Sequence, residues 1–63
     1  MRDYWIVSKE GRFFKTYLTR VVSYRKKQFS ETIINIAAHK YRTEQNAIRA
    51  SLAFGGVIDK GQE

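Results

Sequence analysis

The sequence predicts an α+β fold, in which a small antiparallel β-sheet of three to five strands packs against one C-terminal helix. Near the start of the chain, two runs rich in aromatic and β-branched residues flank a glycine-containing turn, as in a β-hairpin. Near its end, an apolar stripe at helical spacing follows a threonine suited to cap a helix. With 63 residues the chain is expected to form a single domain, residues 1–63.

The first hairpin is expected to have Lys9-Glu10-Gly11 as a three-residue loop between its two strands. Gly11 would take the left-handed conformation, because glycine alone accepts a positive φ without a steric penalty. This register makes both faces of the hairpin apolar, and one helix covers only one of them. The second face, here called the spare face, carries Trp5, Val7, Phe13 and Tyr17 with Lys15 beside them.

Three kinds of cover for the spare face stay open: stacked single-stranded bases, a second copy of the chain, or residues 29–38 folded back over it. A domain this small usually needs a disulfide, a metal or a partner to supplement its core. The sequence has no cysteine and one histidine, which excludes disulfides, thiolate metal sites and a histidine metal cluster. A homodimer without metal or cofactor is therefore expected.

The middle of the chain is ambiguous. Apolar residues between 13 and 22 and again between 33 and 41 recur at helical spacing, so an all-helical structure over 12–54 is an alternative. The density of Phe, Tyr, Val and Thr favours strands instead. Periodicity leaves strand and helix open for residues 19–38.

The C-terminal helix is expected from about Thr43 to Phe54. Thr43 is a suitable N-cap, and Glu44 places a negative charge in the first turn, where the helix dipole favours it. Gly55 is placed for the C-cap, and Val57-Ile58 then predicts a short strand.

Charge points to a binding partner. Twelve Lys and Arg against six Asp and Glu give a net charge of +6. Between Gly11 and Thr43 the only acid is Glu31. A basic field of this kind attracts phosphates or acidic surfaces.

The strongest candidate site is the basic run with its flanking aromatic residue. Arginine forks onto phosphate and aromatic rings stack on bases, which is the usual chemistry of nucleic-acid surfaces. The alternative is a solvated edge whose lysines prevent strands from pairing edge to edge. The candidate residues are Arg20, Tyr24, Arg25, Lys26 and Lys27.

Catalysis is not expected. His39 is the only side chain that ordinarily acts as a base near neutral pH, and no nucleophile motif or glycine-rich phosphate loop accompanies it. We expect it to be an exposed or hydrogen-bonded strand residue, and the protein not to be an enzyme.

The layout of the whole chain resembles many small, mostly uncharacterised phage and prophage proteins. The resemblance rests on the Lys-Glu-Gly turn, a short strand ending in an aromatic residue, the Thr43 helix start and the Gly55-Gly56 strand. This sequence departs from the layout of those proteins over Val21–Gln28, where its basic run is unusual for them. The resemblance implies an α+β binding protein, with regulators of host enzymes and anti-defence factors among its relatives.

Two functions of different classes follow. The first is a small module whose basic face binds nucleic acid or a nucleoprotein. The second is a phage-type inhibitor, acting in anti-defence or host takeover, that docks on a host protein. No signal peptide or membrane span is predicted, so the expected location is the cytoplasm, that of the host if a phage encodes the chain.

Overall fold

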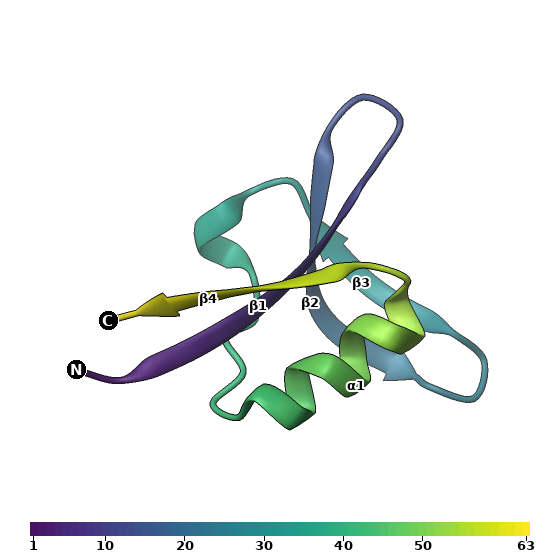
Figure 1. Ribbon diagram of the computed structural model, residues 1–63. Coiled ribbons are helices and arrows are strands. Elements are labelled where there is room, and N and C mark those ends of the chain that lie inside the picture. The colour runs from purple at the N-terminus through teal and green to yellow at the C-terminus, as the bar shows by residue number, and fades with distance from the viewer.

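A computed structural model describes residues 1–63 and confirms the α+β fold, with a four-stranded antiparallel sheet and one C-terminal helix. The strand order is β3-β2-β1-β4, so the first strand lies inside the sheet and the last lies at its edge (Figure 1). The elements are β1 (Asp3–Glu10), β2 (Lys15–Ser23), β3 (Gln28–Thr32), the short 3₁₀ helix η1 (Asn35–Ala37), α1 (Glu44–Phe54) and β4 (Val57–Gln62). No helix is long and apolar enough to cross a membrane.

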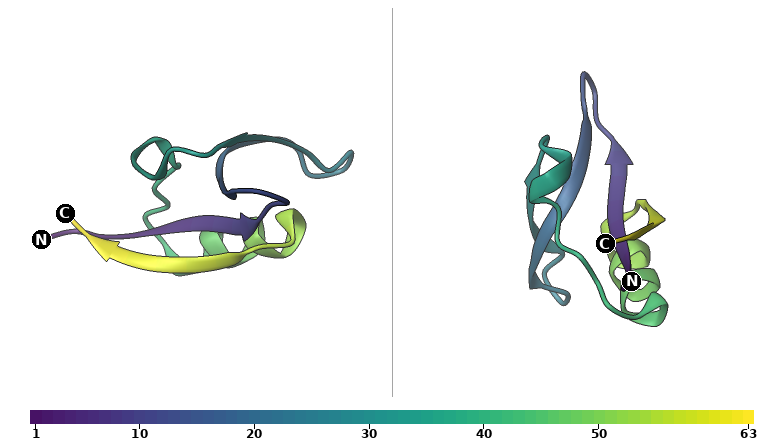
Figure 2. Two further views of the ribbon diagram at one scale, coloured as in Figure 1. Left: turned by 90° about the horizontal axis from the view of Figure 1, so that it is seen from above. Right: turned by 90° about the vertical axis from the view of Figure 1, so that its left-hand side faces the viewer.

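The helix α1 begins and ends where the sequence predicts. The Thr43 hydroxyl accepts a hydrogen bond from the backbone N–H of Asn46 at 3.3 Å, which satisfies one of the free donors of the first turn. Gly55 ends the helix with a φ of 83°, a left-handed conformation that favours glycine. Ala47 and Ala50 are fully buried, because small side chains let α1 approach the sheet closely (Figure 2).

A single apolar core lies between α1 and the sheet. Val7 of β1 and Leu18 of β2 are fully buried in it, together with helix residues that include Phe54. The ring of Phe54 meets Phe29 of β3 edge to face, with centroids 5.3 Å apart. The half-buried residues Trp5, Val21, Phe29, Tyr41 and Ile58 pack around this core.

The first hairpin forms, but its predicted register is wrong. Glu10 pairs with Lys15, so the turn is the four-residue segment Gly11–Phe14 in place of a three-residue loop. Gly11 does not have a positive φ. Its N–H donates to the carbonyl oxygen of Phe14 at 2.9 Å, and a Cβ atom on Gly11 would overlap that oxygen. Glycine is therefore required here for a close backbone approach.

The corrected register divides the predicted spare face. Val7 is fully buried in the core, and Trp5 packs against the core from one side. Tyr17, next to the buried Leu18 on β2, points to the opposite side of the sheet. Phe13 stands in the turn with 80% of its surface exposed, and Lys15 is exposed at the start of β2. These five residues do not form one surface.

The all-helical alternative for residues 12–54 is also wrong, because β2 and β3 occupy much of that segment. Residues 33–41 run from the end of β3 back to β1, and Ala38 is buried on the way. The N–H of His39 donates to the carbonyl oxygen of Leu18 at 3.1 Å, and Trp5 and Tyr41 exchange two backbone hydrogen bonds. His39 is exposed as expected but lies outside any strand.

The last strand, β4, extends beyond the short strand expected at Val57-Ile58. It pairs with β1 from Ser8 opposite Val57 to Asp3 opposite Gln62. The two chain ends lie side by side as a result (Figure 2). Ser8 is fully buried between neighbouring strands, and its hydroxyl has no hydrogen-bond partner.

Candidate nucleic-acid interface

The basic run forms the turn between β2 and β3. The turn comprises residues Tyr24–Lys27, and its backbone is closed by an N–H of Lys27 that donates to the carbonyl oxygen of Tyr24 at 3.3 Å. The hydroxyl of Ser23 accepts a further hydrogen bond from the N–H of Lys26 at 3.1 Å. Lys27 has a φ of 53°, in the left-handed region, at the end of the turn that leads into β3. This backbone leaves the side chains of Arg25, Lys26 and Lys27 exposed.

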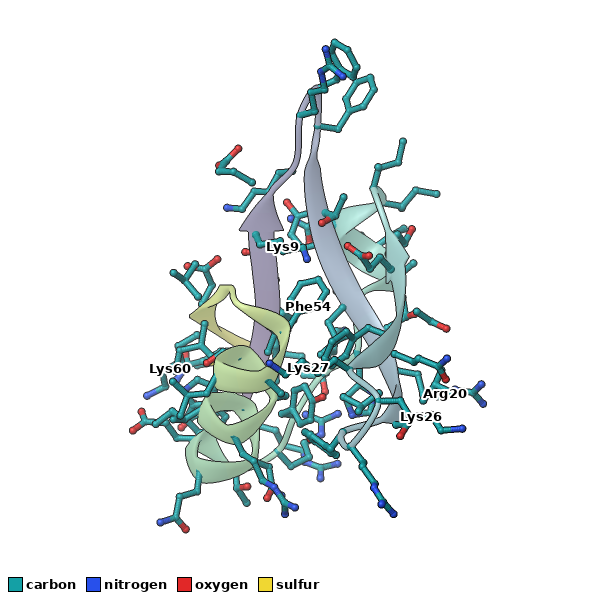
Figure 3. The ribbon with its side chains drawn as sticks, turned by 90° about the vertical axis from the view of Figure 1, so that its right-hand side faces the viewer. Lys9, Arg20, Lys26, Lys27, Phe54 and Lys60 are labelled. Atoms are coloured by element: carbon teal, nitrogen blue, oxygen red, sulfur yellow. The ribbon has the colours of Figure 1, made fainter.

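Arg20 reaches the same end of the molecule from β2. It pairs with Ser30 of β3, between two register shifts at Leu18/Arg20 and at Val21/Ser23. Such irregularities increase the local twist of a strand and change the direction of its side chains. Figure 3 shows Arg20 and Lys26 projecting away from α1, whereas Lys27 points toward that helix.

The helix contributes a fifth cation that the sequence did not assign to this site. The guanidinium of Arg49 lies over the ring of Tyr24, 4.9 Å from its centroid, in a cation–π contact. The Tyr24 side chain is 40% exposed, so part of the ring stays accessible. We call Arg20, Arg25, Lys26, Lys27 and Arg49 the basic patch, with Tyr24 at its centre.

None of the five cations of the basic patch forms a salt bridge. All five are exposed. Unpaired cations on a shared surface keep their field in solution, because no carboxylate cancels it at short range. This surface therefore attracts anions.

The cations near β4 differ, because carboxylates neutralise them. Lys60 lies 3.6 Å from Asp3, and Lys15 lies 3.9 Å from Asp59. Glu63 binds Arg42 and also Lys40, the latter at 3.2 Å. The net charge of +6 is consequently concentrated away from β4.

Two titrating groups have shifted pKa values. Hydrogen bonds from Arg42 and Lys40 lower the pKa of Glu63 below its usual 4.5. Burial raises the pKa of Tyr41 above its usual 10.0, and the nearby Tyr24 adds to this rise. Tyr41 is therefore uncharged at physiological pH.

The structure places four of the residues that the sequence assigned to a nucleic-acid site in one turn, Tyr24–Lys27, and Arg20 on the adjoining strand β2. Arg49 of α1 contacts Tyr24 of this turn. Arg49 is exposed on α1, far along the chain from the basic run. No spacing rule connects Arg49 with Tyr24, because their contact joins two separate elements. The only sign of this contact in the sequence was an aromatic residue, Tyr24, in a chain rich in arginine.

The rest of the surface offers no enclosed site. No pocket is present, and no three His, Asp or Glu side chains gather where a metal ion could bind. The basic patch is thus an open surface suited to a large partner.

Comparison with known proteins gives no relative: no family model, curated protein or solved structure matches this chain.

Proposed function

We propose that the protein is a non-enzymatic module whose basic patch binds nucleic acid. One observation carries the proposal: the five cations around Tyr24 have no carboxylate partners, whereas the cations near β4 are paired. In this function the cations contact phosphates, and the exposed part of the Tyr24 ring stacks on a base.

The open shape of the surface suits phosphate contacts more than base-edge recognition. Phosphate contacts position a protein on nucleic acid without reading its sequence. We therefore expect binding to be weakly dependent on sequence and strongly dependent on salt.

A salt titration tests the proposal. Five phosphate contacts would give a slope of about −4.5 in log affinity against log salt on duplex DNA. Arg25→Glu with Lys26→Glu should flatten this slope by about 2 and weaken binding strongly at low salt. The matched control is Lys15→Glu with Lys60→Glu, which makes the same change in net charge at cations that are already paired.

Absence of binding to both DNA and RNA at low salt would overturn the proposal. Equal losses in the two double variants would also overturn it, because net charge alone would then explain the binding. Capture of a host protein from nuclease-treated lysate, with no nucleic-acid affinity, would support the inhibitor function instead.

A further inference from the structure

Exposed apolar side chains lie in two segments of the molecule, the β1–β2 turn and the residues that follow β3 into η1. β3 ends at Thr32, opposite Tyr17, so the residues that follow it leave the sheet beside the base of the first hairpin. Figure 1 shows the β1–β2 turn at the top and η1 at the left, and both are separated from the β2–β3 turn at the lower right. We call these side chains the apolar patch, and their exposed fractions are Phe13 80%, Phe14 65%, Ile33 59%, Ile34 56% and Ile36 87%.

The exposed area of the chain is larger than a monomer of its mass normally has. The accessible surface is 4754 Å² for a mass of 7.4 kDa. The scaling for folded monomers gives about 4,200 Å² at this mass. The chain therefore exposes about 500 Å² more than this scaling gives. A twofold contact that buried this area on each copy would bury about 1,000 Å² in total, which is the lower limit for a specific interface.

The charges around the apolar patch would not repel a second copy of the chain. Arg12 lies over the ring of Phe13 at 5.4 Å and forms no salt bridge. Glu10 precedes this turn and Glu31 lies on the adjacent β3, and neither is in a salt bridge. This end thus carries free charges of both signs, which a twofold arrangement can pair across the interface.

We infer that the apolar patch is a self-association surface and that a second copy of this chain docks on it about a twofold axis. The basic patches then lie at the outer ends of the dimer. The long dimension of one chain is 34 Å. The two patches would be up to about 70 Å apart, or about twenty base pairs at 3.4 Å per pair. This second step rests on the proposed nucleic-acid function.

Sedimentation tests the interface with variants that leave the core intact. The wild-type chain is expected to form dimers at micromolar concentration. Ile36→Asp and Phe13→Ser, at positions outside the core, should sediment as folded monomers. The matched control is Leu52→Asp, a residue 79% exposed on α1 and outside the apolar patch, which should leave the dimer intact. If the wild-type chain is still a folded monomer at about 100 µM, a concentration at least ten times higher, the inference is overturned.

Duplex length separates this inference from the proposed function. The wild type should bind a duplex of about 30 base pairs at least tenfold more tightly than one of about 12, because both patches engage the longer one. Ile36→Asp should lose this gain and keep the salt-dependent binding of the shorter duplex. A wild-type dimer with no such gain would overturn the bivalent arrangement. Absence of binding to either duplex and to RNA would overturn the proposed function together with the bivalent arrangement, and would leave the dimer itself standing.

Discussion

The two turns at the ends of β2 have the same length of four residues and different surfaces. The β1–β2 turn, Gly11–Phe14, exposes two phenylalanine rings, whereas the β2–β3 turn, Tyr24–Lys27, exposes three cations beside a tyrosine. Each turn is closed by a local backbone hydrogen bond, from Gly11 to Phe14 and from Lys27 to Tyr24.

Neither turn contributes to the apolar core, which lies between α1 and the sheet. The side chains of both turns are therefore free of packing constraints. A chain with so small a core would gain stability by burying its phenylalanines, and the proposed self-association surface would bury the two that the β1–β2 turn exposes. The fold and the two candidate surfaces can thus be tested separately.

The largest expected effect contrasts a phenylalanine of the core with one of the turn. Phe54→Ala should lower the free energy of unfolding by about 3–5 kcal/mol, because it removes the ring that Phe29 packs against. Phe13→Ala should change the stability of the monomer by less than about 0.5 kcal/mol. Chemical denaturation at low protein concentration measures both. A large loss of unfolding free energy in the Phe13→Ala variant would show that the turn belongs to the core.

The next effect tests how the β1–β2 turn is closed. Gly11→Val should cost more than about 1 kcal/mol, because its Cβ would overlap the carbonyl oxygen of Phe14. Gly11→Ala should cost nearly as much, since the overlap involves the Cβ atom itself. Melting curves decide between the causes: a destabilised valine variant with an unaffected alanine variant would contradict an overlap at Cβ.

A third effect compares the aromatic residues of the two turns. Tyr24→Ala should weaken binding of a short single strand about tenfold, since base stacking contributes about 1–3 kcal/mol per base. Phe13→Ala should leave this affinity unchanged. Fluorescence anisotropy with a labelled oligonucleotide measures both. Equal losses of affinity in the two variants would mean that both turns bind the same ligand.

The smallest effect concerns the cations that Glu63 neutralises. Because the folded protein lowers the pKa of Glu63, its contacts stabilise the fold above pH 4.5 and lose this effect as the pH falls below that value. Glu63→Gln should therefore melt slightly below the wild type at pH 7 and together with it near pH 2, about two units below the usual pKa. A difference in melting temperature that persists at low pH would contradict this role of Glu63.

Local sequence rules predicted the parts of the fold that local chemistry controls. Thr43 and Gly55 cap α1 through contacts with residues a few positions away. The basic run of the β2–β3 turn was visible as consecutive residues, but its conformation was left open between strand and helix. The register of the first hairpin was not, because glycine serves both positive φ and close backbone approach, and the sequence does not distinguish these uses of Gly11. The turn begins two residues later than predicted and is one residue longer, so Ser8 lies opposite Tyr17 and Val7 belongs to the core in place of the predicted spare face.

Long-range contacts explain the other structural features that the sequence did not predict. Arg49 joins the basic patch through Tyr24, on a different element of the structure. Tyr41 pairs with Trp5 across the sheet, and this pairing decides how residues 33–41 return to β1. Such contacts depend on the whole fold, which neither composition nor periodicity contains.

The pairing of β4 with β1 also sets an order for folding. Residues 8–10 of β1 pair with β2 in the local hairpin, but β4, the partner on the other edge of β1, lies about fifty residues further along the chain, a separation typical of slow steps. Until that partner arrives, β1 presents an open edge rich in aromatic and β-branched residues, which favours pairing with other unfinished chains. Aggregation during refolding should therefore increase with protein concentration, and a peptide with the sequence of β4 should suppress it.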